Sequence, residues 1–113
     1  MTPAKHNLSI YRGRDYSVEF EFRDNEGVLI PIDNWSFKSE IKDGECIESN
    51  LLATFTIAVD TTNSRVLLSL TDTETLAIPE NSPAFWDLLV TIGTIDESYI
   101  SGKVKILCVP TEV

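Results

Sequence analysis

Along most of this chain, hydrophobic and polar residues alternate with a period of two. The clearest case is residues 16–23, where four hydrophobic residues are separated by polar or charged ones. Successive side chains of a β-strand point to opposite faces, so this pattern predicts a strand with one face in a core and the other in water. The inward row of this strand is predicted to be Tyr16, Val18, Phe20 and Phe22.

The same alternation recurs in the segments 34–44, 51–60, 83–93 and 99–109. Their predicted inward rows are Trp35, Phe37 and Ile41; Leu51, Ala53, Phe55, Ile57 and Val59; Trp86, Leu88, Val90 and Ile92; and Ile100, Val104, Ile106 and Cys108. Gly102 interrupts the last row, which indicates either a bulge or a large neighbour such as Trp35 or Trp86.

Turn residues lie between the predicted strands. Residues 24–27 (Asp-Asn-Glu-Gly) predict a turn whose glycine has a positive φ, and Asp43-Gly44 predicts a tight turn. Residues 61–64 join the segments 51–60 and 65–70 into the clearest hairpin of the chain.

One segment, LLSLTDTETLAIP at residues 67–79, departs from the period of two. Thr71 and Glu74 have the spacing of a capping box, in which each side chain accepts a hydrogen bond from the other residue's backbone N–H. Pro79 cannot continue a helix. We therefore expect one short helical turn near residues 72–77, with Leu76 and Ile78 closing the open end of the fold.

Together these elements predict an all-β fold, either a β-sandwich or a small barrel. We interpret it as a single immunoglobulin-like β-sandwich of about seven to eight short, mostly antiparallel strands, although Cys46, Trp86 and Cys108 do not have the immunoglobulin spacing. The 113 residues are enough for one domain, 1–113, with its own core. Residues 1–7 are expected to form an extended N-terminal arm.

Charge narrows the choice of partner. The chain has 18 acidic and 9 basic residues, a formal net charge of −9, and would repel a nucleic-acid backbone. The acidic excess favours solubility, while cation binding and an electropositive protein partner remain open. No apolar stretch approaches the ~18 residues of a membrane-spanning helix, and the start of the chain has no apolar signal region. We therefore predict neither a membrane partner nor a signal peptide.

Residues that commonly carry out catalysis are sparse. The only histidine is His6, so a nucleophilic triad would have to use it. Cys46 and Cys108 are predicted to be free, partly buried thiols, and with His6 they would lack a fourth zinc ligand. We predict no catalytic, cofactor-binding or metal-binding residue, no cofactor and no small-molecule substrate, and we do not expect an enzyme.

Three further candidates have a simpler structural interpretation. Asp87 lies in an apolar strand and is predicted to face away from Trp86, as an exposed or hydrogen-bonded residue. Residues 24–27 and 60–63 could hold calcium only with ligands from elsewhere. Trp35 and Trp86 could form a sugar platform, but their inward positions favour core packing.

Several motifs, taken in order, resemble a known family. The matching positions are Gly13-Arg14-Asp15, Gly27, Pro31 to Trp35, Leu70 to Pro79, Trp86 to Leu88 and Gly102 to Val104. This pattern resembles a small β-sandwich domain of tailed-bacteriophage structural proteins, including the N-terminal domain of the upper baseplate protein family. It is a signature of fold and context rather than of an active site.

The resemblance implies a non-enzymatic structural or docking protein of a tailed-phage virion, in the baseplate, tail, neck or fibre attachment. Such a protein is made in the host cytoplasm, is located in the virion and contacts other virion proteins in a symmetric multimeric assembly. The alternatives are a capsid decoration protein or a carbohydrate- or cell-surface-binding β-sandwich module. Partner-binding residues are not identified, although residues 1–7 and the exposed sheet edges are plausible contact elements.

Overall fold

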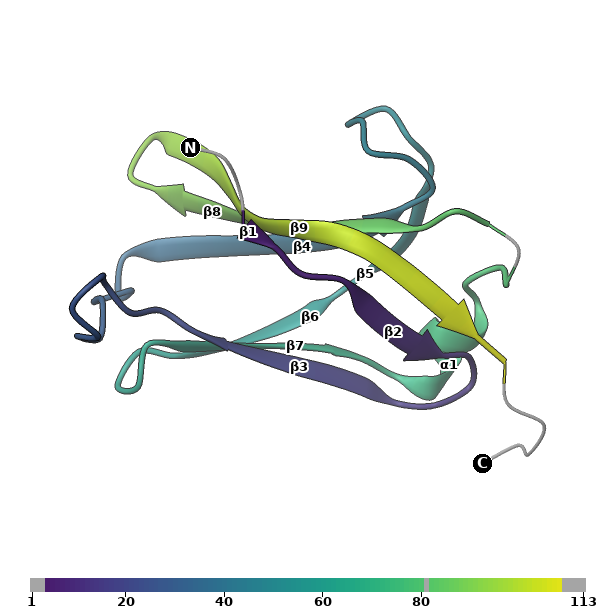
Figure 1. Cartoon of the computed structure of the whole chain (residues 1–113), viewed down its shortest axis with the longest axis horizontal. Helices are drawn as coiled ribbons and strands as arrows, with labels where there is room; N and C mark the ends of the chain where they lie inside the picture. Colours follow the sequence, from purple (N-terminus) through teal and green to yellow (C-terminus); the bar gives the residue numbers. More distant parts are fainter. Residues whose placement is uncertain (1–3, 81, 109–113) are drawn as a thin grey trace.

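The computed structural model describes residues 4–80 and 82–108, which form two β-sheets packed face to face (Figure 1). The large sheet contains β1 (Ala4–Lys5), β9 (Ile95–Leu107), β8 (Phe85–Ile92), β4 (Trp35–Lys42) and β5 (Leu51–Thr54) in this order, with β2 (Leu8–Tyr11) also paired to β9. The small sheet has the order β3 (Tyr16–Glu21), β7 (Arg65–Leu70) and β6 (Thr56–Asp60). The predicted all-β sandwich is confirmed, and the strand order in both sheets is that of immunoglobulin-type sandwiches.

The core lies between the two sheets. Its fully buried hydrophobic side chains include Ile10, Ile32, Ile41, Val66, Leu68, Ile78, Leu88 and Val90. Trp86 is 3% exposed and stacks on Phe20, with ring centroids 5.7 Å apart. Trp35 is half-buried against Phe22 and Tyr99. The predicted inward position is therefore confirmed for Trp86 and partly confirmed for Trp35.

The segment 51–60 was predicted to be one strand, and this prediction is wrong. The chain crosses between the sheets at Phe55, so that β5 pairs with β4 and β6 pairs with β7. Phe55 is buried, and its N–H donates to the Ser39 carbonyl oxygen at 3.0 Å. Both β5 and β6 lie at sheet edges, which leaves Leu51 and Val59 exposed rather than inward.

The connecting loops agree with the sequence only in part. The β6–β7 hairpin and the positive φ of Gly27 (81°) are confirmed. The prediction of a tight turn at residues 43–44 is wrong, because β4 and β5 are joined by the longer loop 43–50. The β8–β9 turn is instead the tight one, and Ile92 pairs with Ile95 across it.

Helix α1 (Asp72–Leu76) follows β7 and turns the chain back towards β8. The predicted capping box is present, because the Thr71 Oγ1 accepts from the Glu74 N–H and the Glu74 carboxylate accepts from the Thr71 N–H. Ile78 is buried, as predicted. Leu76 does not close the fold, because it is 54% exposed.

The N-terminal segment belongs to the large sheet and is not an arm from Ala4 onward. Residues 4–5 and 8–11 pair in parallel with β9, in one common register. Residues 1–3 of the expected arm lie outside the described residues. The other strand pairs of the two sheets are antiparallel, as predicted.

Between β1 and β2, the chain crosses over Gly102. The His6 N–H still donates to the Ser101 carbonyl, but the His6 carbonyl turns away and accepts from the Trp86 Nε1–H at 2.7 Å. The Asn7 Oδ1 accepts from the Lys103 N–H at 3.0 Å. In a parallel ladder this N–H would bond to the His6 carbonyl, so the asparagine side chain replaces a backbone acceptor.

Candidate functional site

A groove of about 830 Å³ lies on the outer face of the large sheet, and we refer to it as the outer groove. Its walls come from β1, β4, β8, β9 and the loop 43–50, which rises beside the sheet in Figure 1. The side chains at its base are those that point away from the core on each strand. The lining residues used below are Lys5, Lys38, Glu40, Lys42, Phe85, Asp87, Leu89 and Lys103, with Glu45 to Ile47 from the loop.

Four of the five lysines of the chain line the outer groove. This is a large share for a chain whose net charge is −9. Glu40 and Asp87 are direct neighbours across β4 and β8, and like charges in that position repel each other. Along β8, Asp87 alternates with the buried Trp86 and Leu88 and so lies on the outward face, as predicted.

The outer groove combines hydrophobic surface with charged groups of both signs. Hydrophobic surface from Phe85 and Leu89 lies among ammonium and carboxylate groups, and such charged groups occur mainly at the polar rim of protein contacts. Among the described lining residues there is no histidine, and Cys46 is the one thiol. His6 packs its ring edge-on against Phe20, with centroids 5.5 Å apart, on the other side of the sheet.

A second candidate region is the corner at which residues 12–15 form hydrogen bonds with α1 and the residues that follow it. Thr75 is fully buried, and its Oγ1 accepts from the N–H groups of Gly13 (3.0 Å) and Arg14 (3.2 Å) and donates to the Arg14 carbonyl (2.8 Å). The Asp15 carboxylate accepts from the Asp72 N–H at 2.8 Å. The Asp15 contact satisfies one of the N–H groups that the first turn of a helix leaves without partners. The Thr75 contacts instead satisfy backbone groups of residues 13 and 14.

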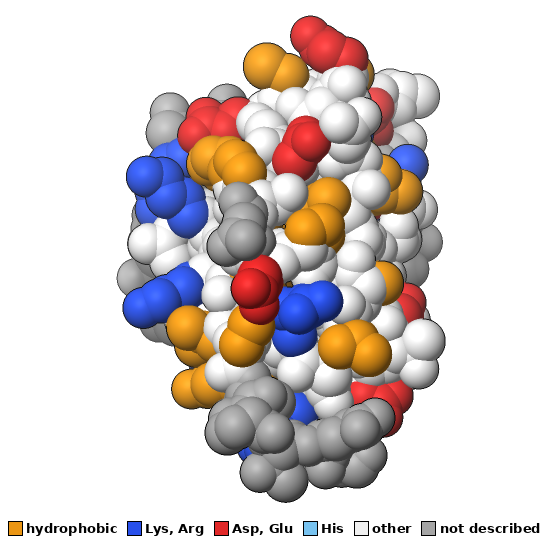
Figure 2. Space-filling model, turned by 90° about the vertical axis from the view of Figure 1, so that its right-hand side faces the viewer, with side chains coloured by type: hydrophobic (Ala, Val, Ile, Leu, Met, Phe, Trp, Pro, Cys, Tyr) orange, Lys and Arg blue, Asp and Glu red, His pale blue; other side chains and the backbone are white. Residues whose placement is uncertain are grey.

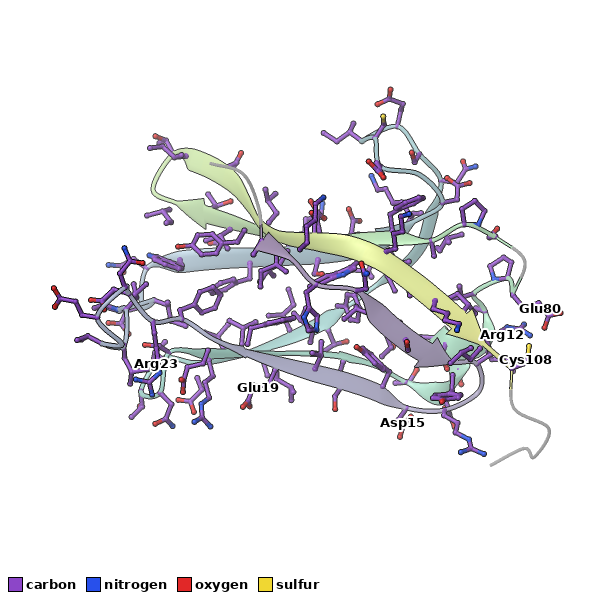
Figure 3. The ribbon with its side chains drawn as sticks, viewed as in Figure 1. Arg12, Asp15, Glu19, Arg23, Glu80 and Cys108 are labelled. Carbon is purple, nitrogen blue, oxygen red and sulfur yellow. The ribbon has the colours of Figure 1, made fainter. Side chains whose placement is uncertain are left out.

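Arg12 completes this corner from the other end of the helix. Its guanidinium donates to the carbonyls of Leu76 (2.9 Å) and Ile78 (2.7 Å), and it lies 3.7 Å from the Glu80 carboxylate. Figure 3 shows Arg12, Glu80 and Cys108 together where β9 ends. The Cys108 thiol donates to Glu80.

Both cysteines are free, as predicted, but both are exposed, so the prediction of partly buried thiols is wrong. Cys108 follows the end of β9, and Cys46 lies on the loop 43–50. The hydrogen bond to the Glu80 carboxylate raises the pKa of the Cys108 thiol. A raised pKa lowers the thiolate fraction, so this arrangement does not activate Cys108 as a nucleophile.

Carboxylates on the outer face of the small sheet and in the turns have local partners. Arg65 lies 3.1 Å from Glu21 and 3.6 Å from Glu19, and Arg23 also donates to Glu21. These hydrogen bonds lower the pKa of Glu21, first through Arg23 and then through Arg65. Glu19 and Arg23 can be followed along this sheet in Figure 3.

In the two turns that were considered for calcium binding, the aspartate carboxylates accept hydrogen bonds from nearby residues of the same turn. Asp24 Oδ1 accepts from the N–H groups of Glu26 (2.9 Å) and Val28 (3.0 Å). The side chain and backbone N–H of Asn63 donate to Asp60 and lower the pKa of its carboxyl. Over residues 4–80 and 82–108, no group of three His, Cys, Asp or Glu residues could hold a metal ion. The same part of the chain contains no helix long and apolar enough to cross a bilayer.

Neither protein-family models nor curated protein sequences match this chain. The similarity to the phage domain therefore stays an interpretation of the sequence motifs.

Figure 2 shows the end of the molecule that contains α1, where acidic, basic and hydrophobic side chains are interspersed.

The outer groove was not predicted from the sequence, although the outward positions of several lysines pointed to it. Alternation correctly places Lys38, Lys42 and Lys103 on outward faces. Their convergence depends on the pairing of β4 with β8 and of β8 with β9, and on β1 bringing Lys5 beside Ser101. The corner at α1, in contrast, was predicted from its capping box.

Proposed function

We propose that this chain is a non-enzymatic structural or docking protein of a tailed-bacteriophage virion, acting through protein–protein interfaces. The observation that carries the proposal is the corner at α1. Residues 13–15 and 70–79 are two motifs of the phage-domain pattern, and the hydrogen bonds of Thr75 and Asp15 join them into one unit. The motif residues thus have architectural roles, as expected of a signature of fold and context.

The partners are other virion proteins, arranged around the symmetry axis of a tail, neck or baseplate. Repeated copies make many weak contacts cooperate, so modest interfaces suffice for stable assembly. A capsid decoration protein would use the same kind of contact. A carbohydrate-binding module is less well supported, because Tyr11 is the one aromatic among the exposed large hydrophobic residues of the described chain.

Mass spectrometry of purified virions tests the proposal. Virions of the phage that encodes this chain, banded by density gradient, are expected to contain its peptides at a fixed ratio to the major capsid protein. An abundant non-structural protein of the same phage serves as the control for contamination. Absence of the peptides from virions that contain all other tail proteins would overturn the proposal.

A further inference from the structure

The loop 43–50 has a defined shape. The Asp43 carboxylate accepts from both the backbone N–H and the side-chain amide of Asn50, each at 2.9 Å, and the Asp43 N–H donates to the Asn50 carbonyl at 3.0 Å. The Lys42 ammonium donates to the Ile47 carbonyl at 2.7 Å. These bonds hold the two ends of the loop together and support its tip.

The tip of this loop is hydrophobic at its centre and acidic at its sides. Ile47 is 87% exposed, the highest value among the exposed large hydrophobic residues described. Glu45 and Glu48 flank it and are also exposed. A single exposed hydrophobic residue is ordinary. A hydrogen-bonded loop that presents one between two carboxylates is a candidate contact surface.

The outer groove has the complementary chemistry. Phe85 and Leu89 supply hydrophobic surface, and the ammonium groups of Lys5, Lys38 and Lys103 surround it. Carboxylates beside such lysines would gain attraction, and the apolar area would cover Ile47.

We propose that the outer groove is the contact surface between two copies of this chain, in which the loop 43–50 of each copy lies over the groove of the other. A two-fold contact requires one patch that contains both complementary halves. The loop borders the groove on the same face, and four of its residues line it, so this requirement is met.

The local pairing of groove lysines with loop carboxylates, and not the net charge of −9 that each copy carries, favours a second copy over other partners. Nucleic acid is disfavoured by that net charge. A different acidic protein would satisfy the lysines but would leave the loop tip of this chain uncovered. A second copy covers both halves at once. The inference is independent of the proposed virion role, because it concerns the isolated chain.

Sedimentation equilibrium of the purified chain from ~1 µM to ~1 mM tests this inference, the range in which modest homodimers dissociate. The wild type is expected to reach twice the monomer mass, and ~1 M salt is expected to weaken the association, because such salt screens charges beyond ~3 Å. Ile47→Ser is expected to weaken the dimer by about tenfold or more. Since Ile47 is exposed, this change leaves the core intact.

Charge reversal identifies the two halves of the contact. Reversal of the groove (Lys38→Glu with Lys103→Glu) or of the loop (Glu45→Lys with Glu48→Lys) should each abolish the dimer. Their combination in one chain should restore it, because each lysine again meets a carboxylate. Glu26→Lys, in the exposed turn before β4, is the matched control and should leave the dimer unchanged.

A chain that stays monomeric throughout this range would overturn the inference and leave the proposed function untouched. So would a dimer that neither the groove nor the loop reversal weakens, or binding of an acidic heterologous protein to the groove of a monomeric chain. Unfolding of each variant in urea verifies that the exposed substitutions do not act through stability.

Discussion

At Gly102 the first segment of the chain passes so close to the last strand that no side chain fits between them. A Cβ atom at this position would lie 2.2 Å from the His6 carbonyl oxygen and 2.7 Å from the His6 carbonyl carbon. The obstacle is backbone, which cannot rotate away. The glycine thus permits the contact that provides Trp86 Nε1–H with its acceptor.

We predict that Gly102→Ala destabilises the fold by about 1–3 kcal/mol, the scale of overpacking in a filled site. The added methyl group displaces His6 and breaks its hydrogen bond with Trp86. Urea unfolding gives the free energy, and the indole N–H resonance of Trp86 should shift in the NMR spectrum. Ser101→Ala, at the adjacent outward position, is the control and should change the free energy of unfolding little. An unshifted Trp86 resonance in Gly102→Ala would contradict this account.

Part of this residue-level picture could be predicted. The gap that Gly102 leaves in an inward row correctly indicated a large neighbour, and Trp86 is its cross-strand partner in β8. The role of His6 could not be foreseen, because it depends on a backbone carbonyl, and every residue has one. No alternation of side chains indicates where the first strand of the chain pairs.

At the scale of elements, the corner at α1 contains two kinds of hydrogen bond that differ in burial. The capping box of Thr71 and Glu74 lies at the surface, where water can replace a lost partner. The Thr75 side chain is fully buried, and its hydroxyl accepts from the partly buried N–H of Gly13 and from the N–H of Arg14, which also has the Tyr11 carbonyl as an acceptor. Loss of the Thr75 hydroxyl should therefore lower the free energy of unfolding more than loss of one capping interaction.

We predict that Glu74→Ala costs about 1 kcal/mol or less and leaves docking unchanged, because it removes one exposed capping interaction. Glu74→Gln is the control, since an amide oxygen can also accept from the Thr71 N–H. Thr75→Val keeps the volume but removes the acceptor of the partly buried Gly13 N–H and one acceptor of the Arg14 N–H, so its cost should be larger, about 1–3 kcal/mol. Thermal unfolding ranks the three variants.

A Glu74→Ala protein that folds normally but fails to assemble into virions would show that the corner is itself an interface. A Thr75→Val protein as stable as Glu74→Ala would show that water reaches the donors of residues 13 and 14.

The elements were predictable where a local pattern determines them and not where pairing determines them. The strands, the capping box and the β6–β7 hairpin follow from side-chain period and turn chemistry. The division of residues 51–60 between two sheets does not, because in the sequence the hydrophobic alternation at positions 51, 53, 55, 57 and 59 continues across the crossing point without a break. Loop 43–50 was also misjudged, because Asp43-Gly44 resembles a tight turn while the Asp43 carboxylate bonds to Asn50 seven residues later.

At the scale of the whole molecule, the first and last strands of the described chain are neighbours. Residues 1–7 were expected to form an arm for partner contacts, and residues 4–7 instead complete the large sheet. The outer groove depends on the same arrangement, because β1 places Lys5 beside β9. No reading of a single segment could predict a site assembled from four strands and a loop.

We predict that deletion of residues 1–7 destabilises the protein by about 1–3 kcal/mol, because the buried Trp86 Nε1–H loses its acceptor. Urea unfolding measures this cost. In a Trp86→Phe background the donor is already absent, so the same deletion should cost less, and a double-mutant cycle gives the difference. An unchanged unfolding midpoint after deletion would favour the arm interpretation for these residues.

The parallel pairing of residues 4–11 with residues 100–107 also determines how the domain would bear tension. A force that draws residue 4 away from residue 108 pulls two parallel strands along their length in opposite directions. The ladder hydrogen bonds are then loaded in shear and share the force, whereas the bonds of a hairpin pulled at its open end break one after another. Under such a load, the resistance of the domain to unfolding is expected to depend on this ladder rather than on the total free energy of unfolding.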